Sequence, residues 1–255
     1  MTPLLSVKQN YIMKTNIKLE KTNKLIKNTL FANQKDYYVI GISGGIDSLV
    51  ALKILINNVG KEKIKAFYLP IENQNDLSDI NLIEKKLDIK INIIDMTNEY
   101  VCFSKKLNFA NKEELANIKP KLRSIYLSSF ALSNNGLVVS CLNFSEYWLG
   151  YFTKYGDSSG DVFPLINFLK SEIYKLAVDF NLPIEIIKKA PSAGLLENQT
   201  DETDFGFTYD DLEKYLLGKN INKNISEKIQ LMNKKNQHKH TLNSYIFDDF
   251  LLRDK

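Results

Sequence analysis

Cysteine is scarce in this sequence. The 255 residues include two cysteines, Cys102 and Cys141, which lie far apart and show no Cys-x-x-Cys spacing. Neither a disulfide framework nor a cysteine-based zinc site is therefore indicated. Cysteines used in this way fit a reducing compartment, so we expect a cytoplasmic protein.

Arginine and long apolar runs are also lacking. Arg123 and Arg253 are the two arginines, and 34 basic against 30 acidic residues leave a net charge of +4. This charge is too small to indicate polynucleotide binding. No apolar run reaches the ~18 residues of a membrane span, and the first fifteen residues contain no apolar core of signal-peptide length. We therefore expect neither a nucleic-acid partner nor a membrane partner.

Short apolar strands alternate with amphipathic helices along the chain, whose 44% hydrophobic and 25% charged residues are ordinary for one soluble domain. Strands are expected at residues 37–41, 64–69, 91–95 and 137–142, with a short fifth strand starting at Val162. Helices are expected at residues 18–32, 77–87, 97–107, 120–133, 169–180 and 208–217, with one more following residue 46 and with Asn134-Asn135-Gly136 as the C-cap after residue 133. This alternation predicts an α/β fold, a doubly wound, Rossmann-like parallel sheet flanked by helices. We expect a single domain over residues 1–255, with a flexible N-terminal segment at residues 1–16.

The most informative stretch is residues 37–48, Tyr-Tyr-Val-Ile-Gly-Ile-Ser-Gly-Gly-Ile-Asp-Ser. It predicts a buried strand, a glycine turn and the first turn of a helix, which together aim free backbone N–H groups and a helix dipole at one spot. The two adjacent glycines allow close approach of a ligand, and the two serines supply hydroxyl donors. We expect a phosphate there. Asp47 would repel a bare phosphate but would bind a bridging Mg²⁺, so the predicted ligand is a nucleoside triphosphate with Mg²⁺.

A bare glycine pair after a strand is usually only a tight turn, but this stretch is more specific. It lacks the Gly-Lys-Ser/Thr ending of a Walker loop and the Gly-x-Gly-x-x-Gly of a dinucleotide fold. It resembles the pyrophosphate loop of the ATP pyrophosphatases, which transfer AMP to a substrate and release pyrophosphate. Glu146 follows the fourth strand as this loop follows the first, so we expect it to meet Asp47 as a second Mg²⁺ ligand. Residues 190–207 are polar and without periodicity, which predicts a lid loop.

Three further runs carry a wider resemblance. They are Leu-Gly-Tyr-Phe-Thr-Lys-Tyr-Gly-Asp at residues 149–157, Lys-Ala-Pro-Ser-Ala-Gly-Leu at 189–195, and Asp-Glu-Thr-Asp-Phe-Gly-Phe-Thr-Tyr-Asp-Asp-Leu-Glu-Lys-Tyr-Leu at 201–216. With the phosphate loop and His238-Lys239, they closely resemble ammonia-dependent NAD synthetase, of the adenine nucleotide alpha hydrolase-like superfamily, from about residue 37 to the C-terminus. The resemblance implies a C–N bond-forming ligase that condenses deamido-NAD with ammonia. ATP would be consumed through an acyl-adenylate to yield NAD, AMP and pyrophosphate, and the enzyme would be a homodimer.

The resemblance also implies roles for individual residues. Asp47 and Lys170 would be catalytic, and Asp47 with Glu146 would hold Mg²⁺. ATP would contact Gly41, Ile42, Ser43, Gly44, Gly45, Ile46, Asp47, Ser48, Cys141, Lys170 and Ser192. Deamido-NAD would contact Lys121, Lys154, Asp161, His238 and Lys239. A dinucleotide with two phosphates and a nicotinate needs several cations, which agrees with the lysines in this set.

Several positions depart from the family pattern. Lys121 replaces an arginine, Tyr68 stands where an arginine is usual, Cys141 stands where a threonine contacts ATP, and Ser158-Ser159 replaces a pair of small residues. Two alternatives therefore stay open, another ATP pyrophosphatase-type amidating enzyme similar to GMP synthetase, and an inactive homologue that acts as a binding protein. About 36 residues precede the phosphate loop, too few for the amidohydrolase domain of glutamine-dependent relatives, so free ammonia is the expected nitrogen donor.

Overall fold

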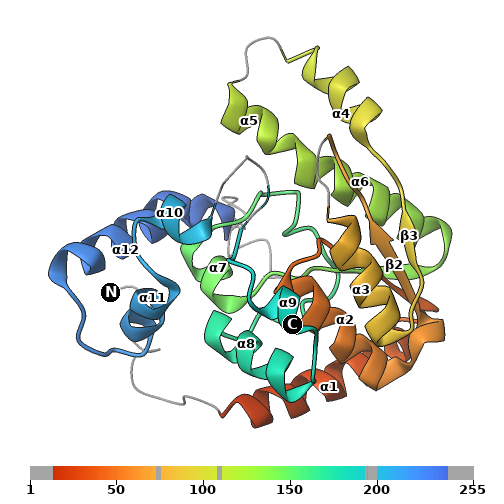
Figure 1. The fold of residues 1–255 in the computed structure, drawn as a ribbon, viewed down its shortest axis with the longest axis horizontal. Helices are drawn as coiled ribbons and strands as arrows, with labels where there is room; N and C mark the ends of the chain where they lie inside the picture. Colours follow the sequence, from red (N-terminus) through yellow and green to blue (C-terminus); the bar gives the residue numbers. More distant parts are fainter. Residues whose placement is uncertain (1–13, 73–75, 108–110, 193, 195–199, 241–255) are drawn as a thin grey trace, which may run out of the picture.

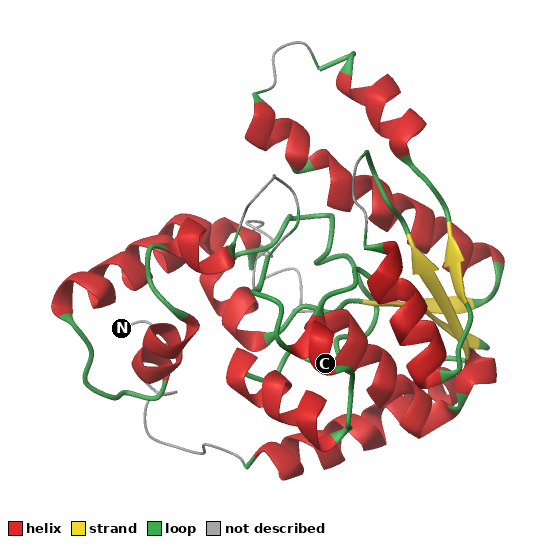
Figure 2. Ribbon diagram, in the orientation of Figure 1, coloured by secondary structure: helices red, strands yellow, loops and turns green. Residues whose placement is uncertain are grey.

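The computed structural model describes residues 14–72, 76–107, 111–192, 194 and 200–240 (Figures 1 and 2). The first half of the chain contains α1 (Thr15–Ala32), β1 (Tyr37–Gly41), α2 (Ile46–Val59), η2 (Lys61–Lys63), β2 (Ile64–Tyr68), α3 (Leu77–Leu87), β3 (Ile91–Ile93), α4 (Thr97–Ser104), α5 (Lys112–Ala116) and α6 (Ile118–Ser133). The second half contains β4 (Gly136–Val139), α7 (Phe144–Leu149), α8 (Lys170–Asp179), α9 (Ile184–Ile187), α10 (Asp201–Phe205), α11 (Tyr209–Leu216), α12 (Lys223–Asn236) and η3 (Gln237–Lys239).

The described strands form one parallel sheet in the order β3-β2-β1-β4. β1 lies inside the sheet, where Val39 is aligned with Lys65 of β2 on one side and with Val138 of β4 on the other. Each connection between parallel strands needs a crossover, and helices provide it. The carboxyl ends of the strands therefore point the same way, and the segments that follow β1 and β4 become neighbours.

Helices cover both faces of this sheet, as expected for a doubly wound fold. Side chains of a strand alternate between its two faces. Tyr38 and Ile40 accordingly belong to the larger core with α1, α2, α3 and α8, whereas Val39 belongs to the core with α4 and α6. The buried Tyr38 hydroxyl donates a hydrogen bond of 2.7 Å to the Ile26 carbonyl and so ties α1 to β1. The predicted fold class is confirmed.

A third core lies away from the sheet, among α7, α10, α11 and α12. It is built around Leu149, Phe205, Phe207, Leu212 and Ile229. Figure 1 shows α10, α11 and α12 grouped at one side of the molecule and the strands at the other. Helix α7 links the two parts, because it follows β4 directly and buries Leu149 in this third core.

The predicted C-cap at residues 134–136 is confirmed for Asn134 and wrong for Gly136. Asn134 occupies the C-cap of α6, Asn135 takes the left-handed conformation with φ of 51°, and Gly136 is the first residue of β4. A side chain at position 136 would bring its Cβ within 2.9 Å of Val39 Cγ2 on the adjacent strand. Glycine at position 136 therefore allows β4 to pack closely against β1, and it does not terminate α6.

Other boundaries also differ from the predictions. β3 and β4 end at Ile93 and Val139, and the predicted fifth strand is a single parallel bridge between Val139 and Val162. Helix α4 ends at Ser104, three residues before the predicted end. The predicted flexible segment at residues 1–16 lies mostly outside the described residues, and its last two residues belong to α1.

The polar stretch at residues 190–207 was predicted to be a loop throughout, and this is wrong for its last part. Helix α10 begins after Thr200, whose hydroxyl accepts a hydrogen bond of 3.3 Å from the Thr203 N–H. The helix ends at Phe205, with Gly206 as its C-cap, and it buries Asp201 and Phe205. Burial of Phe205 among other aromatic rings stabilises a helix too short to show sequence periodicity. In the described part of the chain, no helix is long and apolar enough to cross a membrane.

Candidate active site

A cavity of about 880 Å³ opens at the carboxyl ends of β1, β2 and β4. This edge of a doubly wound sheet is where such folds bind ligands. Every residue predicted to contact ATP lines the cavity, namely Gly41, Ile42, Ser43, Gly44, Gly45, Ile46, Asp47, Ser48, Cys141, Lys170 and Ser192. Residues separated by up to about 150 positions are therefore brought to one site.

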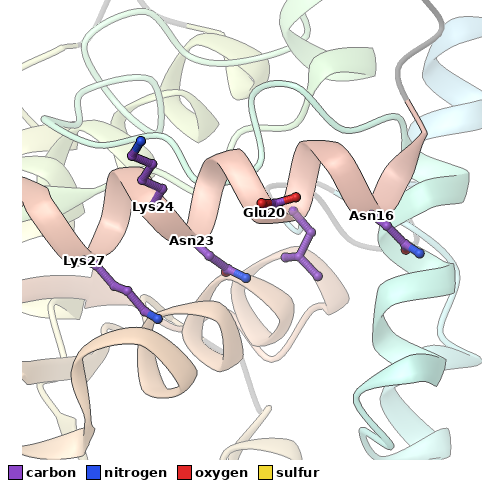
Figure 3. A pocket seen from close by; sticks show the side chains of 6 residues that line it. Asn16, Glu20, Asn23, Lys24 and Lys27 are labelled. Carbon is purple, nitrogen blue, oxygen red and sulfur yellow. The ribbon is translucent and has the colours of Figure 1, made fainter.

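A second hollow, of about 390 Å³, lies along α1 and carries no convergent group of side chains. It is lined by Asn16, Leu19, Glu20, Asn23, Lys24 and Lys27. Figure 3 shows Lys24 pointing away from Asn23 and Lys27. This hollow is separate from the strand ends, and the chemistry of the molecule is concentrated in the larger cavity.

The loop between β1 and α2 is shaped for an anion. Gly44 has φ of 80°, and Gly45 is the N-cap of α2 in an extended conformation. The first N–H groups of α2 have no partners within the helix, so they are available to a ligand in the cavity. A Cβ on Gly44 would lie 3.2 Å from Asp76 Cβ, which leaves little room for a side chain. The Ser43 and Ser48 hydroxyls are 3.2 Å apart, and Ser48 Oγ also donates to the Gly45 carbonyl at 3.0 Å. These hydroxyls fix the loop shape as well as lining the cavity.

Three charged side chains from three helices meet beside this loop. Lys170 Nζ lies 2.6 Å from Asp47 Oδ2 and 3.3 Å from Glu146 Oε1. The Lys170 side chain is 3% exposed, and those of Asp47 and Glu146 are 20% and 16% exposed. One buried ammonium thus holds two carboxylates that remain accessible from the cavity. The predicted meeting of Asp47 and Glu146 at this edge agrees with this arrangement.

Burial and mutual repulsion perturb these groups. Burial raises the pKa of the Glu146 carboxyl to about 8, with Asp47 adding to the rise and Lys170 opposing it. Burial alone would lower the pKa of the Lys170 ammonium, but the carboxylates of Asp47 and Glu146 outweigh burial and raise that pKa. Lys170 is therefore a permanent cation at neutral pH. It can stabilise negative charge, but it cannot act as a base.

Asn143 is a site residue that the sequence interpretation did not assign. It is fully buried, its Oδ1 accepts from the Glu146 N–H at 2.9 Å, and its Nδ2 donates to Asp47 Oδ1 at 3.0 Å. The Asn-x-x-Glu spacing is a capping-box pattern, which was a signal for the helix start at α7. No local pattern could have revealed the bond to Asp47, because the two residues are 96 positions apart.

Lys189 is a second unassigned residue of the cavity wall. Its ammonium pairs with Asp79, and it lies 3.6 Å from Asp76 Oδ1. Asp79 and Asp76 belong to the start of α3, next to Gly44. The pairing neutralises acidic charge beside the phosphate loop and attaches the segment after α9 to the cavity rim.

Two of the predicted ATP contacts, Cys141 and Ser192, are small side chains that line the cavity. Burial raises the pKa of the Cys141 thiol, helped by Asp47 and Glu146, so this cysteine is an uncharged lining group and not a thiolate nucleophile. Ser192 Oγ accepts a hydrogen bond of 3.0 Å from the Gly194 N–H. Both side chains are small polar groups of the wall.

The five residues predicted to contact deamido-NAD do not converge in this cavity. Of these described residues, Lys239 alone lines it, and its Nζ donates to the Gly150 and Phe152 carbonyls at 2.8 Å each. Lys154 Nζ donates to the His238 carbonyl at 2.8 Å, which places three of the five near one another. Lys121 is exposed on α6, and Asp161 Oδ2 accepts from the Val138 N–H at 2.8 Å. Their roles in substrate binding stay predictions.

A glycine loop and a carboxylate pair at the strand ends of a doubly wound sheet are typical of one class of protein, the α/β enzymes that act on phosphate-bearing substrates. The model of the NAD synthase family matches residues 18–243. The chain is 38% identical over 233 residues to the NH(3)-dependent NAD(+) synthetase of Finegoldia magna, covering 90% of this chain and 95% of that protein. It is 40% identical over 207 residues to the protein of the same name from Mycoplasma genitalium, covering 79% and 84%. The chain belongs to the NAD synthase family.

Solved structures agree with this family. The NMN synthetase of Francisella tularensis superimposes with a TM-score of 0.85 at 30% identity, covering 92% of this chain and all of the other. The NH3-dependent NAD synthetase of Campylobacter jejuni, in complex with the nitrate ion, gives a TM-score of 0.77 at 26% identity, with the same coverage. The predicted family resemblance and the enzyme class of a C–N bond-forming ligase are confirmed. A GMP-synthetase-like enzyme and an inactive binding protein are not favoured.

Proposed function

We propose that this chain amidates deamido-NAD with ammonia at the expense of ATP, giving NAD, AMP and pyrophosphate. The observation that carries the proposal is the cluster of Asp47, Glu146 and Lys170 beside an anion-binding loop in the main cavity. The names of the sequence relatives support it. The substrate carboxylate becomes reactive toward ammonia only after adenylation, because a free carboxylate repels nucleophiles and lacks a good leaving group.

The chain's own residues suit adenyl transfer. Amides at the start of α2 would bind phosphate oxygens, and the Lys170 ammonium would stabilise the charge that develops on the departing pyrophosphate. The substrate carboxylate oxygen would attack the α-phosphorus and form the acyl-adenylate. Ammonia would then attack the carbonyl carbon, the C–O bond to AMP would break, and the nitrogen would lose a proton. No side-chain nucleophile is needed, in agreement with the uncharged Cys141 thiol.

The donor set fits a Mg²⁺ ion that also binds phosphate. Asp47 and Glu146 supply carboxylate oxygens, and Mg²⁺ in nucleotide sites commonly takes one or two carboxylates plus phosphates and waters. Among the described residues no group of three or more His, Cys, Asp and Glu side chains could hold a metal, so phosphate oxygens would complete the shell. Burial raises the pKa of the Glu146 carboxyl and the nearby Asp47 carboxylate adds to the rise, so a bound cation would favour the ionised form of Glu146. A bound Mg²⁺ would neutralise phosphate charge during adenyl transfer.

The stretch at residues 190–207 keeps its proposed role as a lid over the site. Ala190, Pro191, Ser192 and Gly194 line the cavity, as does Asp201 at the start of α10. The ion pairs of Lys189 support one end of this cover. A cover of this kind would protect the acyl-adenylate from hydrolysis.

A second candidate substrate is nicotinate mononucleotide. The structural similarity to the Francisella tularensis NMN synthetase, with a TM-score of 0.85 against 0.77 for the Campylobacter jejuni enzyme, favours it. A cavity of about 880 Å³ also lies within the usual range of about 300–1,000 Å³ for one small-molecule site. The same adenylation and amidation would apply, because the reacting nicotinate carboxylate is the same.

We also propose a homodimer in the cytoplasm. Ile26 and Leu30 of α1 are buried in the core of the chain, at 0% and 6% exposure, and so are not available to a partner. Leu25, Phe31 and Leu132 remain 54%, 88% and 83% exposed, and these side chains support the proposal of a partner surface. Sedimentation at micromolar concentration tests the dimer, and a fully active monomer would overturn it.

The function is tested by incubating the purified chain with ATP, Mg²⁺ and ammonium, together with deamido-NAD in one series and nicotinate mononucleotide in another. We expect NAD from the first series with equal amounts of AMP and pyrophosphate, measured by chromatography. Glutamine in place of ammonium is the matched control and should give little product. ADP as the product, or no amide from either substrate, would overturn the proposed function. Preferential conversion of the mononucleotide would select the second candidate.

A further inference from the structure

Helix α7 ends in an unusual set of contacts with α12 and η3. Four side chains of the later segment, Asn233, Asn236, Lys239 and His240, bond to backbone carbonyls at and just beyond the end of α7. We call these four residues the capping cluster. Asn233, Asn236 and Lys239 follow one another at intervals of three residues, and His240 comes directly after Lys239. Each of the four is less exposed than the neighbours at positions 234, 235, 237 and 238.

The bonds of the capping cluster reach consecutive carbonyls. His240 Nε2 lies 2.5 Å from the Tyr147 carbonyl, Asn233 Nδ2 donates to Trp148 at 2.5 Å, and Asn236 Nδ2 donates to Leu149 at 3.0 Å. Lys239 Nζ donates to Gly150 and Phe152 at 2.8 Å each. A carbonyl can only accept, so the imidazole of His240 must donate through Nε2.

These bonds provide hydrogen-bond donors for the carbonyl groups at the C-terminal end of α7. The last four carbonyls of any helix lack partners within the helix, and α7 has only six residues. The Lys239 ammonium also places positive charge at the negative end of the helix dipole. The approach of α12 is close, since a Cβ on Gly150 would lie 2.4 Å from Asn236 Cβ.

The N-terminal end of α7 contributes residues to the candidate active site. Its third residue is Glu146, which pairs with Lys170, and its N-cap is Asn143, which bonds to Asp47. A six-residue helix has no room to bend between its two ends, so a shift at Leu149 moves Glu146 with it.

Resting on the proposed function, we propose that the capping cluster positions Glu146 for the metal through α7, and that Asn236 is a positioning residue of the active site. Asn236 does not line the cavity, so it acts only through the helix. The third hydrophobic core, which includes Leu149 of α7 and Ile229 of α12, holds the two helices together, and the capping cluster fixes their register and orientation.

The test uses three variants of the full chain. Asn236→Asp keeps the shape but turns the donor nitrogen into a carboxylate oxygen facing the Leu149 carbonyl. Asn236→Gln keeps a donor and is the conservative rescue. Gln230→Ala is the matched control, because Gln230 lies on the same helix, is exposed and bonds only to Ser226.

The first measurement is amide hydrogen exchange, which needs no ligand. Asn236→Asp should exchange faster at the amides of Gly150 and Tyr151, which bond to the Glu146 carbonyl, while Gln230→Ala should match the unchanged protein. Equal protection in Asn236→Asp would overturn the contact between the capping cluster and α7.

The second measurement is binding of Mn²⁺ in the presence of ATP, followed by electron paramagnetic resonance. Asn236→Asp should bind Mn²⁺ about tenfold more weakly, as is typical when support of a metal ligand is lost, with KM for deamido-NAD unchanged and with Asn236→Gln closer to normal. A lower melting temperature with normal Mn²⁺ affinity would reduce the capping cluster to a structural role and overturn the proposal. A rise in KM for deamido-NAD alone would also overturn it. Absence of Mn²⁺ binding by the unchanged protein would overturn the proposed function itself, whereas the exchange result would still stand.

Discussion

Asn143 Nδ2 donates a hydrogen bond of 3.0 Å to Asp47 Oδ1 and so joins the segment after β4 to the helix after β1. Asn143 is fully buried, and its Oδ1 caps α7 at the Glu146 N–H. One amide therefore sets the positions of both carboxylates of the site. An amide suits this place because it offers a donor on one side and an acceptor on the other.

Replacing Asn143 tests this relationship. Asn143→Asp keeps an N-cap acceptor but puts a carboxylate oxygen against Asp47, so we expect α7 to persist and NAD synthesis to fall at least about tenfold. Asn111→Asp is the matched control, because Asn111 forms the same capping box at α5 on an exposed surface. Steady-state rates and circular dichroism are the measurements. Equal activity in the two variants would show that the bond to Asp47 is unimportant.

Removing either carboxylate charge should abolish turnover in Mg²⁺. Asp47→Asn and Glu146→Gln each delete one proposed metal-ligand charge at the cavity and no core volume, so the fold should remain. Turnover is measured as pyrophosphate release, and the fold by melting temperature. Near-normal synthesis of NAD by either variant would refute the metal assignment.

Lys170→Met should weaken both folding and catalysis. The substitution leaves Asp47 and Glu146 beside each other without their shared cation, and loss of one partner from a buried ion pair costs about 3 kcal/mol. The matched control is Lys214→Met, which breaks the surface pair with Asp210 and should change the free energy of unfolding much less, because solvent screens such pairs. Urea unfolding measures the two free energies. Equal losses would mean that the Lys170 pairs contribute no more than a surface pair.

Gly150→Ala and Gly218→Ala separate backbone strain from contact with α12. Both glycines have positive φ, 67° and 69°, so alanine at either position costs about 1 kcal/mol. A Cβ at position 150 meets Asn236 at 2.4 Å, whereas nothing lies within 4 Å of a Cβ at position 218. Gly150→Ala should therefore lower the free energy of unfolding by about 1–3 kcal/mol more. Thermal and urea unfolding give the difference, and equal costs would contradict the close approach.

Asp201 should make stability depend on pH. Its side chain is 3% exposed, and burial raises the pKa of its carboxyl despite the hydrogen bond of 2.7 Å that Tyr209 donates to it. A raised pKa in the folded state favours the protonated folded form. The contribution of Asp201 to stability is thus fully present below about pH 3.9, the ordinary Asp value, and is lost as the pH rises through the raised value. Asp201→Asn should remove this part of the dependence, as urea unfolding at a series of pH values will show. An unchanged difference between the two proteins across that window would contradict the prediction.

Local patterns in the sequence determined the strands, most helices and the phosphate loop. The continuous apolar run at residues 37–40 and the glycine pair in the loop that follows are short-range signals, and they held because burial on both faces of a parallel sheet leaves few other choices. Local signals were weakest at Gly136 and at α10. There a tertiary contact, with Val39 in one case and with a cluster of aromatic rings in the other, decides a conformation that the neighbouring residues leave open.

The sequence by itself also indicated which groups the site needs, since a phosphate loop and two carboxylates are chemically recognisable and the family resemblance implies Lys170. Only the tertiary structure decided how they are joined. Lys170 meets Asp47 from 123 positions away, and Asn143 meets Asp47 from 96 positions away. The physical reason is the parallel sheet, which places the ends of β1 and β4 side by side whatever the length of chain between them. The capping cluster on α7 has the same origin, because its donors belong to a helix whose polar face matches unpaired carbonyls about 85 residues earlier.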